Sequence, residues 1–311
     1  MPTLTGKIED NVLDIVIASS LESVLFGDMD EVLAAHPATI TPEISPGRQR
    51  MSANIPPAGG ASKPPAAVGM FTAESLPRIL PFLVYMAFIV IGDLLARLGW
   101  TSDQLRYLYG VKVGAVLAVL LYYRRRYCEL AAPRLAGPRL AGPRLAGPRL
   151  TSAGPSARTL AVAVAVASGL LVLVLWINLD AAWMTVGTSA GFDPRNDGRI
   201  DWMLVALRLF GAALVVPVME ELFWRSFLMR WIDSPAFLHM NPANTRLKAF
   251  LVTAVLFGFE HNLWLAGIVA GAVYSLLYMR SQTLWSPILA HAVTNGMLGL
   301  WIISTNHWTY W

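Results

Sequence analysis

The sequence predicts an all-α fold, a polytopic bundle of about seven transmembrane helices. Of the 311 residues, 55% are hydrophobic and only 14% are charged, and the mean hydropathy is +0.52. A chain of this composition has too little polar surface to enclose a soluble globule. Several apolar segments also reach the roughly 17 to 25 residues needed to cross a membrane core about 30 Å thick. Composition and segment length therefore both indicate a membrane protein.

Seven apolar segments account for the expected spans, and two of them are slightly short. The segments lie near residues 79–98, 107–123, 159–179, 202–219, 249–264, 265–279 and 284–303. The two short ones are 249–264 and 265–279. The chain accordingly divides into N-terminal transmembrane helices at 71–130 and a transmembrane core at 159–311.

Two segments outside the spans are rich in residues that do not build a core. Residues 1–70 include a Pro-, Ala- and Gly-rich tract and are expected to be a disordered extension, which translation from Met51 or Met70 would largely remove. Residues 131–158 repeat Arg, Pro and Gly directly after three consecutive arginines, so the positive-inside rule predicts that the loop at 124–158 is cytoplasmic. A solvated linker is the simplest interpretation of the repeat, and a contact with anionic lipid is the alternative.

Charge and cysteine content exclude two further interpretations. The net charge is +4, but the basic residues concentrate in the loop beside a hydrophobic helix, so no nucleic-acid partner is expected. The single cysteine, Cys128, rules out an intrachain disulfide. The expected partners are the lipid bilayer and whatever the transmembrane core binds.

Three polar motifs interrupt the apolar segments of the last third of the chain. They are "EELFWR" with Glu220, Glu221 and Arg225, "FGFEH" ending at His261, and "HAVTN" from His291 to Asn295. An ionisable side chain in the middle of a span costs roughly 2.5 to 3.5 kcal/mol on insertion scales, so such residues require partners or a function.

Helical spacing predicts how these side chains are grouped. Glu221 and Arg225 are four residues apart, so they share a helix face and can form an ion pair, while Glu220 points about 100° away and stays free. His291 and Asn295 are likewise one turn apart and can present an imidazole and an amide to the same point. Phe257 precedes His261 by one turn on another helix.

This set of side chains fits hydrolysis in two different ways. A buried glutamate can take a proton from water, while histidine and asparagine stabilise the oxyanion. Alternatively, Glu220, His261 and His291 form a catalytic zinc ligand set, in which Zn²⁺ activates the water. The cofactor therefore stays open. Packing roles are the simpler explanation for any single motif, above all for the Glu221 and Arg225 pair, but the three motifs together favour a site.

The ordered motifs E-E-x-x-x-R, F-x-x-x-H and H-x-x-x-N resemble those of the CAAX protease and bacteriocin-processing family of intramembrane proteases. The resemblance covers about residues 200 to 305, and the stretch "PVMEELFWRSFLMRWI" is similar to a bacterial subgroup, CAAX prenyl protease-related, associated with exosortase systems. It implies an intramembrane endopeptidase in a bacterial inner membrane, acting on a prenylated CAAX-like tail or a peptide precursor.

The resemblance also implies a role for each residue. Glu220 is the general base with His261 beside it, His291 and Asn295 bind the oxyanion, and Glu221, Arg225 and Phe257 support the site. The family is described both as metalloproteases and as metal-free glutamate proteases, so the resemblance leaves the metal open.

Two other functions use the same residues differently. A proton-coupled transporter would use the glutamate and histidines as a relay, and a non-catalytic scaffold or immunity protein would retain the motifs by descent. Neither the H-E-x-x-H zinc signature nor the G-x-S-x-G serine elbow occurs.

Simple alternation of spans would place His261 and His291 at different depths, so a short or re-entrant helix is expected around "EHNLWLAG". The oligomeric state stays open.

Overall fold

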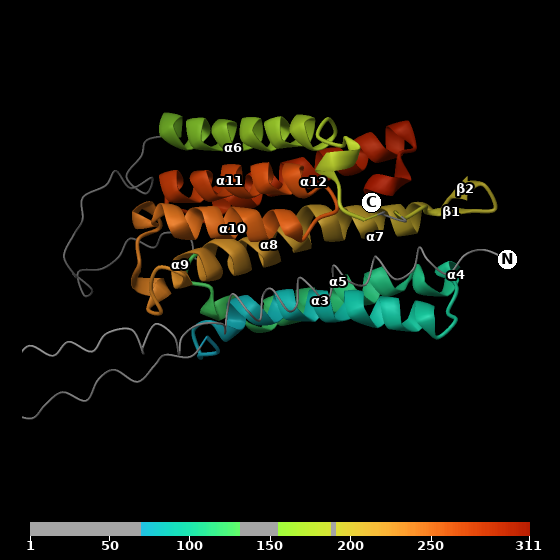
Figure 1. The fold of residues 1–311 in the computed structure, drawn as a ribbon, viewed down its shortest axis with the longest axis horizontal. Coiled ribbons are helices and arrows are strands. Elements are labelled where there is room, and N and C mark those ends of the chain that lie inside the picture. The colour runs from blue at the N-terminus through green and yellow to red at the C-terminus, as the bar shows by residue number, and fades with distance from the viewer. Residues whose placement is uncertain (1–69, 131–154, 188–190) are drawn as a thin grey trace, which may run out of the picture. The chain divides into compact units, whose positions relative to one another are not determined.

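The computed structural model describes residues 70–130, 155–187 and 191–311, and their regular structure is almost entirely helical (Figure 1). The helices are α3 (Leu76–Arg97), α4 (Ser102–Leu105), α5 (Leu108–Tyr122), α6 (Pro155–Trp176), α7 (Trp202–Phe210), α8 (Val216–Glu221), α9 (Met229–Trp231), α10 (Leu247–Phe259), α11 (Trp264–Ser281) and α12 (Trp285–Thr305). The two short strands β1 (Arg195–Asn196) and β2 (Arg199–Ile200) pair antiparallel. The predicted all-α fold is therefore confirmed. The expected N-terminal extension and most of the arginine repeat lie outside the described residues.

Five of the described helical segments are long and apolar enough to cross a membrane. They are Leu76–Arg97, Ser102–Tyr122, Arg158–Trp176, Trp202–Trp231 and Trp285–Thr305. The expected spans near 249–264 and 265–279 correspond to α10, which has only 13 residues, and α11, and neither is among the five. The structure thus supports a multi-pass membrane protein in which α10 and α11 differ from the other helices.

The helices are arranged around the long segment that contains α7, α8 and α9. On one side of it α3 packs against α5, and on the other side α10, α11, α12 and α6 follow (Figure 1). Large apolar side chains such as Val90 and Leu160 are exposed on the outer helices, whereas Glu221, Arg225 and His291 are buried. This distribution, apolar outside and polar inside, is expected for a bundle surrounded by lipid.

The close contact between α10 and α11 depends on glycine. Gly267 and Gly271 are four residues apart on α11, and their backbones lie against Gly258 and Ala254 of α10. A Cβ atom on Gly267 would lie 2.8 Å from the Cα atom of Gly258, which is too close for any side chain. Small residues at this spacing let transmembrane helices approach closely. The contact therefore holds α10 and α11 together as a helical hairpin.

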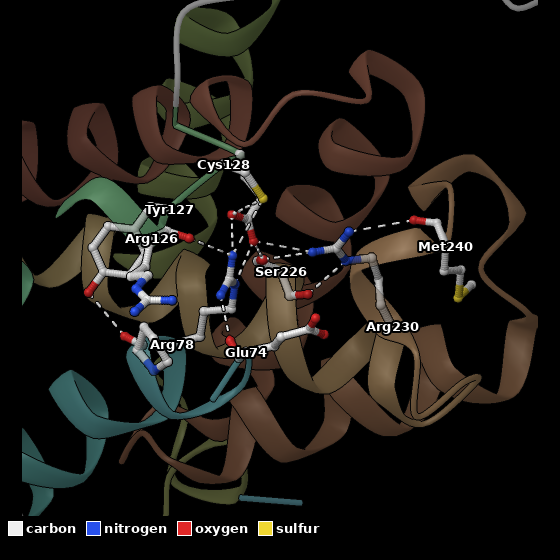
Figure 2. Close-up of polar contacts among 10 residues, drawn as sticks. Glu74, Arg78, Arg126, Tyr127, Cys128, Ser226, Arg230 and Met240 are labelled. Carbon is white, nitrogen blue, oxygen red and sulfur yellow. Dashed lines mark hydrogen bonds and ion pairs between the residues drawn. The ribbon is translucent and has the colours of Figure 1, made fainter. Parts of the chain in front are cut away.

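A buried cluster of charged residues ties the N-terminal helices to the segment that follows α8. Glu129, just beyond α5, accepts hydrogen bonds from Arg78 of α3, with Nε at 2.7 Å and an N–H of the terminal nitrogen at 2.6 Å. It also accepts hydrogen bonds from the hydroxyl of Ser226 and, at 3.3 Å, from Arg230. Figure 2 shows Ser226 between Arg78 and Arg230. One carboxylate thus joins three parts of the chain that are distant in sequence.

The charges of this cluster set the ionisation of Glu129. Burial alone raises the pKa of a carboxyl group, but the hydrogen bonds and the positive charge of Arg78 outweigh it and hold the pKa of Glu129 at about 2, below the ordinary value of 4.5. A carboxylate with a depressed pKa contributes stability above its unfolded-state pKa, and the contribution is lost as the pH falls from about 4.5 towards 2. The cluster should therefore weaken only in acid.

Replacing Gly267 should separate α10 from α11. We expect Gly267→Leu to lower the free energy of unfolding by at least about 1 to 3 kcal/mol, because a buried side chain is forced into a filled contact. Gly114→Leu is the matched control, since Gly114 is exposed on α5 and no atom lies within 4 Å of its Cβ position. Thermal unfolding followed by tryptophan fluorescence measures both variants. Equal stability of the two would contradict the close helix contact.

Removing the charge of Glu129 should destabilise the fold. Glu129→Gln leaves Arg78 and Arg230 buried without a counter-charge, so we expect a loss of about 3 to 5 kcal/mol at neutral pH. The unfolding temperature of the wild-type protein should drop between pH 4.5 and 2, and the variant should lack this drop. Glu74→Gln, on an exposed residue nearby, provides the control. A wild-type stability with no acid dependence in this window would show that the cluster is not ionic.

Candidate active site

The helix that carries the two glutamates is interrupted by two π-helical stretches, η3 (Gly211–Val215) before α8 and η4 (Leu222–Leu228) after it. In a π-helix the carbonyl of residue 212 would accept a hydrogen bond from the N–H of residue 217. Residue 217 is proline and has no N–H. The side-chain amide of Asn295 on α12 donates to the Ala212 carbonyl instead, at 2.9 Å. The sequence itself thus produces the irregular turn, and Asn295 completes it.

Glu221 is the centre of a buried ionic network. Its Oε1 atom accepts a hydrogen bond from Arg225 at 3.1 Å and one from His291 Nδ1 at 3.0 Å, and both Glu221 and Arg225 are 0% exposed. The ion pair predicted from the i, i+4 spacing is therefore present, even though Arg225 lies in a π-helical turn. The contact with His291 was not predicted. It connects α8 to α12.

Aromatic rings and a backbone carbonyl complete the surroundings of Arg225. The guanidinium lies over the ring of Phe257 at 4.2 Å and over that of Tyr274 at 5.4 Å, and it donates to the carbonyl of Gly271. Tyr274 in turn stacks on His291, with ring centroids 4.9 Å apart. These contacts fix Arg225 and His291 against each other, because both share the same aromatic neighbour.

Glu220 differs sharply from its neighbour. The residue is 4% exposed, and its Oε2 atom, like that of Glu221, has no hydrogen-bond partner among the described residues. The nearest titratable nitrogen is His291 Nε2, at 3.9 Å. Glu220 also lines a cavity of about 250 Å³, whereas Glu221 does not. Because only Glu220 lines the cavity, the structure agrees with the expectation that Glu220 points away from the Glu221 and Arg225 pair.

The hydrogen bonds assign the protons of both imidazoles. Glu221 Oε1 already accepts from Arg225 and is therefore an acceptor, so His291 must donate from Nδ1. The carbonyl of Phe257 can only accept, so His261 likewise donates from Nδ1, at 2.8 Å. In a neutral imidazole the other nitrogen then carries a lone pair. Both histidines consequently present an unprotonated Nε2.

The cavity brings together the side chains that the three motifs predicted. Glu220, His261, His291 and Asn295 all line it, although they come from α8, the turn after α10, and α12. The chain turns back after the short α10, which removes the conflict in depth between His261 and His291 that simple alternation would create. Phe257 lies between them, with its ring 5.0 Å from that of His261 and 6.1 Å from that of His291.

Other residues at the site were not predicted. Glu260 precedes His261 and accepts a hydrogen bond from Trp224 at 3.1 Å. Thr294 accepts from Tyr274 and donates to the carbonyl of Gly169 on α6. Glu260 lies within "FGFEH", so it could have been identified from the sequence as a charged residue in an apolar segment. Gly169 had no such signal, because only the packing of α6 on α12 reveals its proximity.

The donor atoms only partly suit a metal ion. Histidines that donate Nδ1–H to a carboxylate or carbonyl and expose Nε2 are typical metal ligands. However, no three His, Cys, Asp or Glu side chains come close enough together to hold a metal in residues 70–130, 155–187 and 191–311. Glu220, His261 and His291 therefore do not form a zinc site in this arrangement, and no step is assigned to a metal.

The fold and the site together define a multi-pass membrane protein with a buried carboxylate and imidazole site. Residues 202–297 match the family model described as type II CAAX prenyl endopeptidase Rce1-like. The match extends from the first residue of α7 into α12 and includes every residue of the three motifs. This part of the chain is thus similar to Rce1-like domains, which is consistent with the CAAX protease and bacteriocin-processing family. No curated protein and no solved structure gave a significant match.

The two adjacent glutamates should respond oppositely to the same substitution. Glu221→Gln leaves Arg225 buried without its counter-charge, so we expect a loss of about 3 to 5 kcal/mol in the free energy of unfolding. Glu220→Gln alters a carboxylate whose Oε2 atom has no hydrogen-bond partner among the described residues, so stability should stay unchanged or rise. Thermal unfolding of the two variants in the same detergent compares them directly. A loss of stability in Glu220→Gln as large as that in Glu221→Gln would contradict the assignment.

Proposed function

We propose that the protein is an intramembrane endopeptidase that hydrolyses a peptide bond of a membrane-associated substrate. The observation that carries this proposal is the Oε2 atom of Glu220, which is buried, lacks a hydrogen-bond partner among the described residues and lines the cavity. A fixed carboxylate with a free oxygen is what a general base for water requires. The match of residues 202–297 to the Rce1-like family supports the same class of reaction.

The proposed reaction begins with proton transfer from water to Glu220. The lone pair on His261 Nε2 accepts a hydrogen bond from the same water and orients it, while the hydroxide formed attacks the carbonyl carbon of the substrate. Asn295 uses one amide N–H for the Ala212 carbonyl and retains a second, which is available to the oxyanion of the tetrahedral intermediate.

The intermediate then collapses with a second proton transfer. The bond to the leaving nitrogen breaks as Glu220 returns its proton to that nitrogen, which leaves the enzyme unchanged. The Nε2 atom of His291 can hold the proton in the interval, because Glu221 would stabilise the resulting imidazolium. In this form His291 also becomes a donor and can support the oxyanion together with Asn295.

The surroundings of the site suggest the class of substrate. The outer helices expose apolar side chains, so a substrate carrying a hydrocarbon chain would be held in the same bilayer. We propose a prenylated CAAX-like tail or a peptide precursor as the substrate. We further place the protein in a bacterial inner membrane with the loop at 124–158 in the cytoplasm, in agreement with its many arginines.

Glu220→Gln should slow hydrolysis strongly. Loss of a general base slows catalysis by about 10² to 10⁴-fold, and the amide cannot take a proton from water. The measurement is mass spectrometry of a pool of apolar peptides, with and without an isoprenoid thioether, incubated with the detergent-purified protein.

The control for this experiment is Glu74→Gln, which alters an exposed carboxylate far from the cavity and should leave the rate unchanged. Reactions run in parallel with chelator and with added Zn²⁺ make the comparison independent of metal content. Full activity of the Glu220→Gln protein would refute the proposed role of this residue.

A further inference from the structure

Arg208 places a guanidinium group in the wall of the same cavity. It lies on α7, is partly buried, and lines the cavity together with Glu220. Within the part of the chain that the structure describes, its side chain forms no ion pair with a carboxylate and donates no hydrogen bond. Most other buried or partly buried arginines here do: Arg78, Arg225 and Arg230 all contact carboxylates. An unpaired guanidinium in a low-dielectric environment is costly, which calls for an anionic ligand.

Aromatic rings cover Arg208 without satisfying its hydrogen bonds. The guanidinium carbon lies 4.6 Å from the centre of the Tyr109 ring and 4.8 Å from that of Phe192. Rings stacked on a guanidinium stabilise its charge and leave the N–H groups at its edge free. That edge matches the two oxygens of a carboxylate, which it can bind through two parallel hydrogen bonds.

A second basic side chain lies near Arg208 among the same aromatic rings. The ammonium group of Lys112 lies 3.9 Å from the centre of the Tyr85 ring and 5.1 Å from that of Tyr109, and it too lacks a carboxylate partner among the described residues. Tyr85 and Tyr109 both line the cavity. The cavity therefore has a carboxylate, Glu220, in one part of its wall and the Arg208 guanidinium among aromatic rings in another.

We propose that Arg208 binds the C-terminal carboxylate of the peptide substrate. This inference rests on the proposed endopeptidase function, and it makes the enzyme selective for peptides that end shortly after the cleaved bond. A peptide carboxylate fits better than a lipid phosphate, because Arg208 shares the cavity with Glu220 and a ligand there extends towards the site of hydrolysis.

The spacing along the helix limits how far the cleaved bond can lie from the C-terminus. Glu220 follows Arg208 by 12 residues, and a regular α-helix, at 1.5 Å per residue, would place their Cα atoms about 18 Å apart. The π-helical stretch η3 between them has more residues per turn, so about 18 Å is an upper bound. An extended peptide covers about 3.3 to 3.6 Å per residue, so at most about five residues fit between the two. Cleavage should therefore occur within about five residues of the C-terminus.

The test compares peptides that differ only at their C-terminus. One pool of apolar peptides is synthesised as free acids and the same pool as C-terminal amides, and both are incubated with the full-length protein. We expect the acids to be cleaved about 10- to 100-fold faster, the range expected for charge-assisted hydrogen bonds of about 1.5 to 3 kcal/mol. In Arg208→Gln the ratio of acid to amide rates should fall to near one, and Arg208→Lys should restore part of it.

Arg199→Gln is the matched control, because Arg199 is an exposed arginine just before α7 and its substitution removes the same charge. This variant should keep the wild-type preference for acids. Equal rates for acids and amides in the wild-type protein would overturn the proposal, and so would an Arg208→Gln variant that still prefers acids. Arg208→Gln could instead change the cleavage rate only in phosphatidylglycerol vesicles, and equally for acids and amides. That result would overturn the proposal and indicate that Arg208 binds a lipid headgroup.

A binding measurement separates this inference from the proposed function. Fluorescently labelled acid and amide pools are titrated against the Glu220→Gln protein, with and without Arg208→Gln. Tighter binding of acids that depends on Arg208 would support the carboxylate site even if no peptide is cleaved. Equal binding of acids and amides would overturn it even if hydrolysis by the wild-type protein is observed.

Discussion

The candidate site depends on one carboxylate oxygen, Oε1 of Glu221, which accepts hydrogen bonds from Arg225 and from His291. Both partners are buried, so neither can obtain a substitute from water. The shared acceptor joins the helix that contains α8 to α12 and fixes the tautomer of His291. With Glu221 committed in this way, the adjacent Glu220 is the carboxylate left to face the cavity. The different surroundings of the two neighbouring glutamates thus follow from a single buried contact.

The helix irregularity next to these glutamates has an equally local cause. Pro217 lacks the N–H that the Ala212 carbonyl needs in the π-helical turn, and Asn295 supplies the missing donor. The asparagine therefore links the site to the shape of the helix that carries it. In the proposed mechanism the same amide has a second N–H for the oxyanion, so one side chain both positions the helix and contributes to the chemistry.

Much of this arrangement was predictable from residue types and spacing. The apolar composition gave the all-α membrane fold, the i, i+4 spacing gave the Glu221 and Arg225 ion pair, and the three motifs gave the residues that line the cavity. The number of spans was less predictable, because apolar length alone does not distinguish a full span from helices such as α10 and α11. These two helices pack against each other at Gly267 and are not among the five long apolar segments. Contacts between distant segments, such as that of Glu129 with Arg78, have no periodic signal in the sequence.

The central claim is that Glu220 activates water and does not itself attack the peptide. The most direct test is a single turnover in water enriched in ¹⁸O, with mass spectrometry of the product and of the peptide that contains Glu220. Direct attack by water predicts one ¹⁸O atom in the new carboxyl group of the product and none in Glu220. An unlabelled product together with ¹⁸O in the Glu220 side chain would instead identify a covalent acyl intermediate and contradict the account.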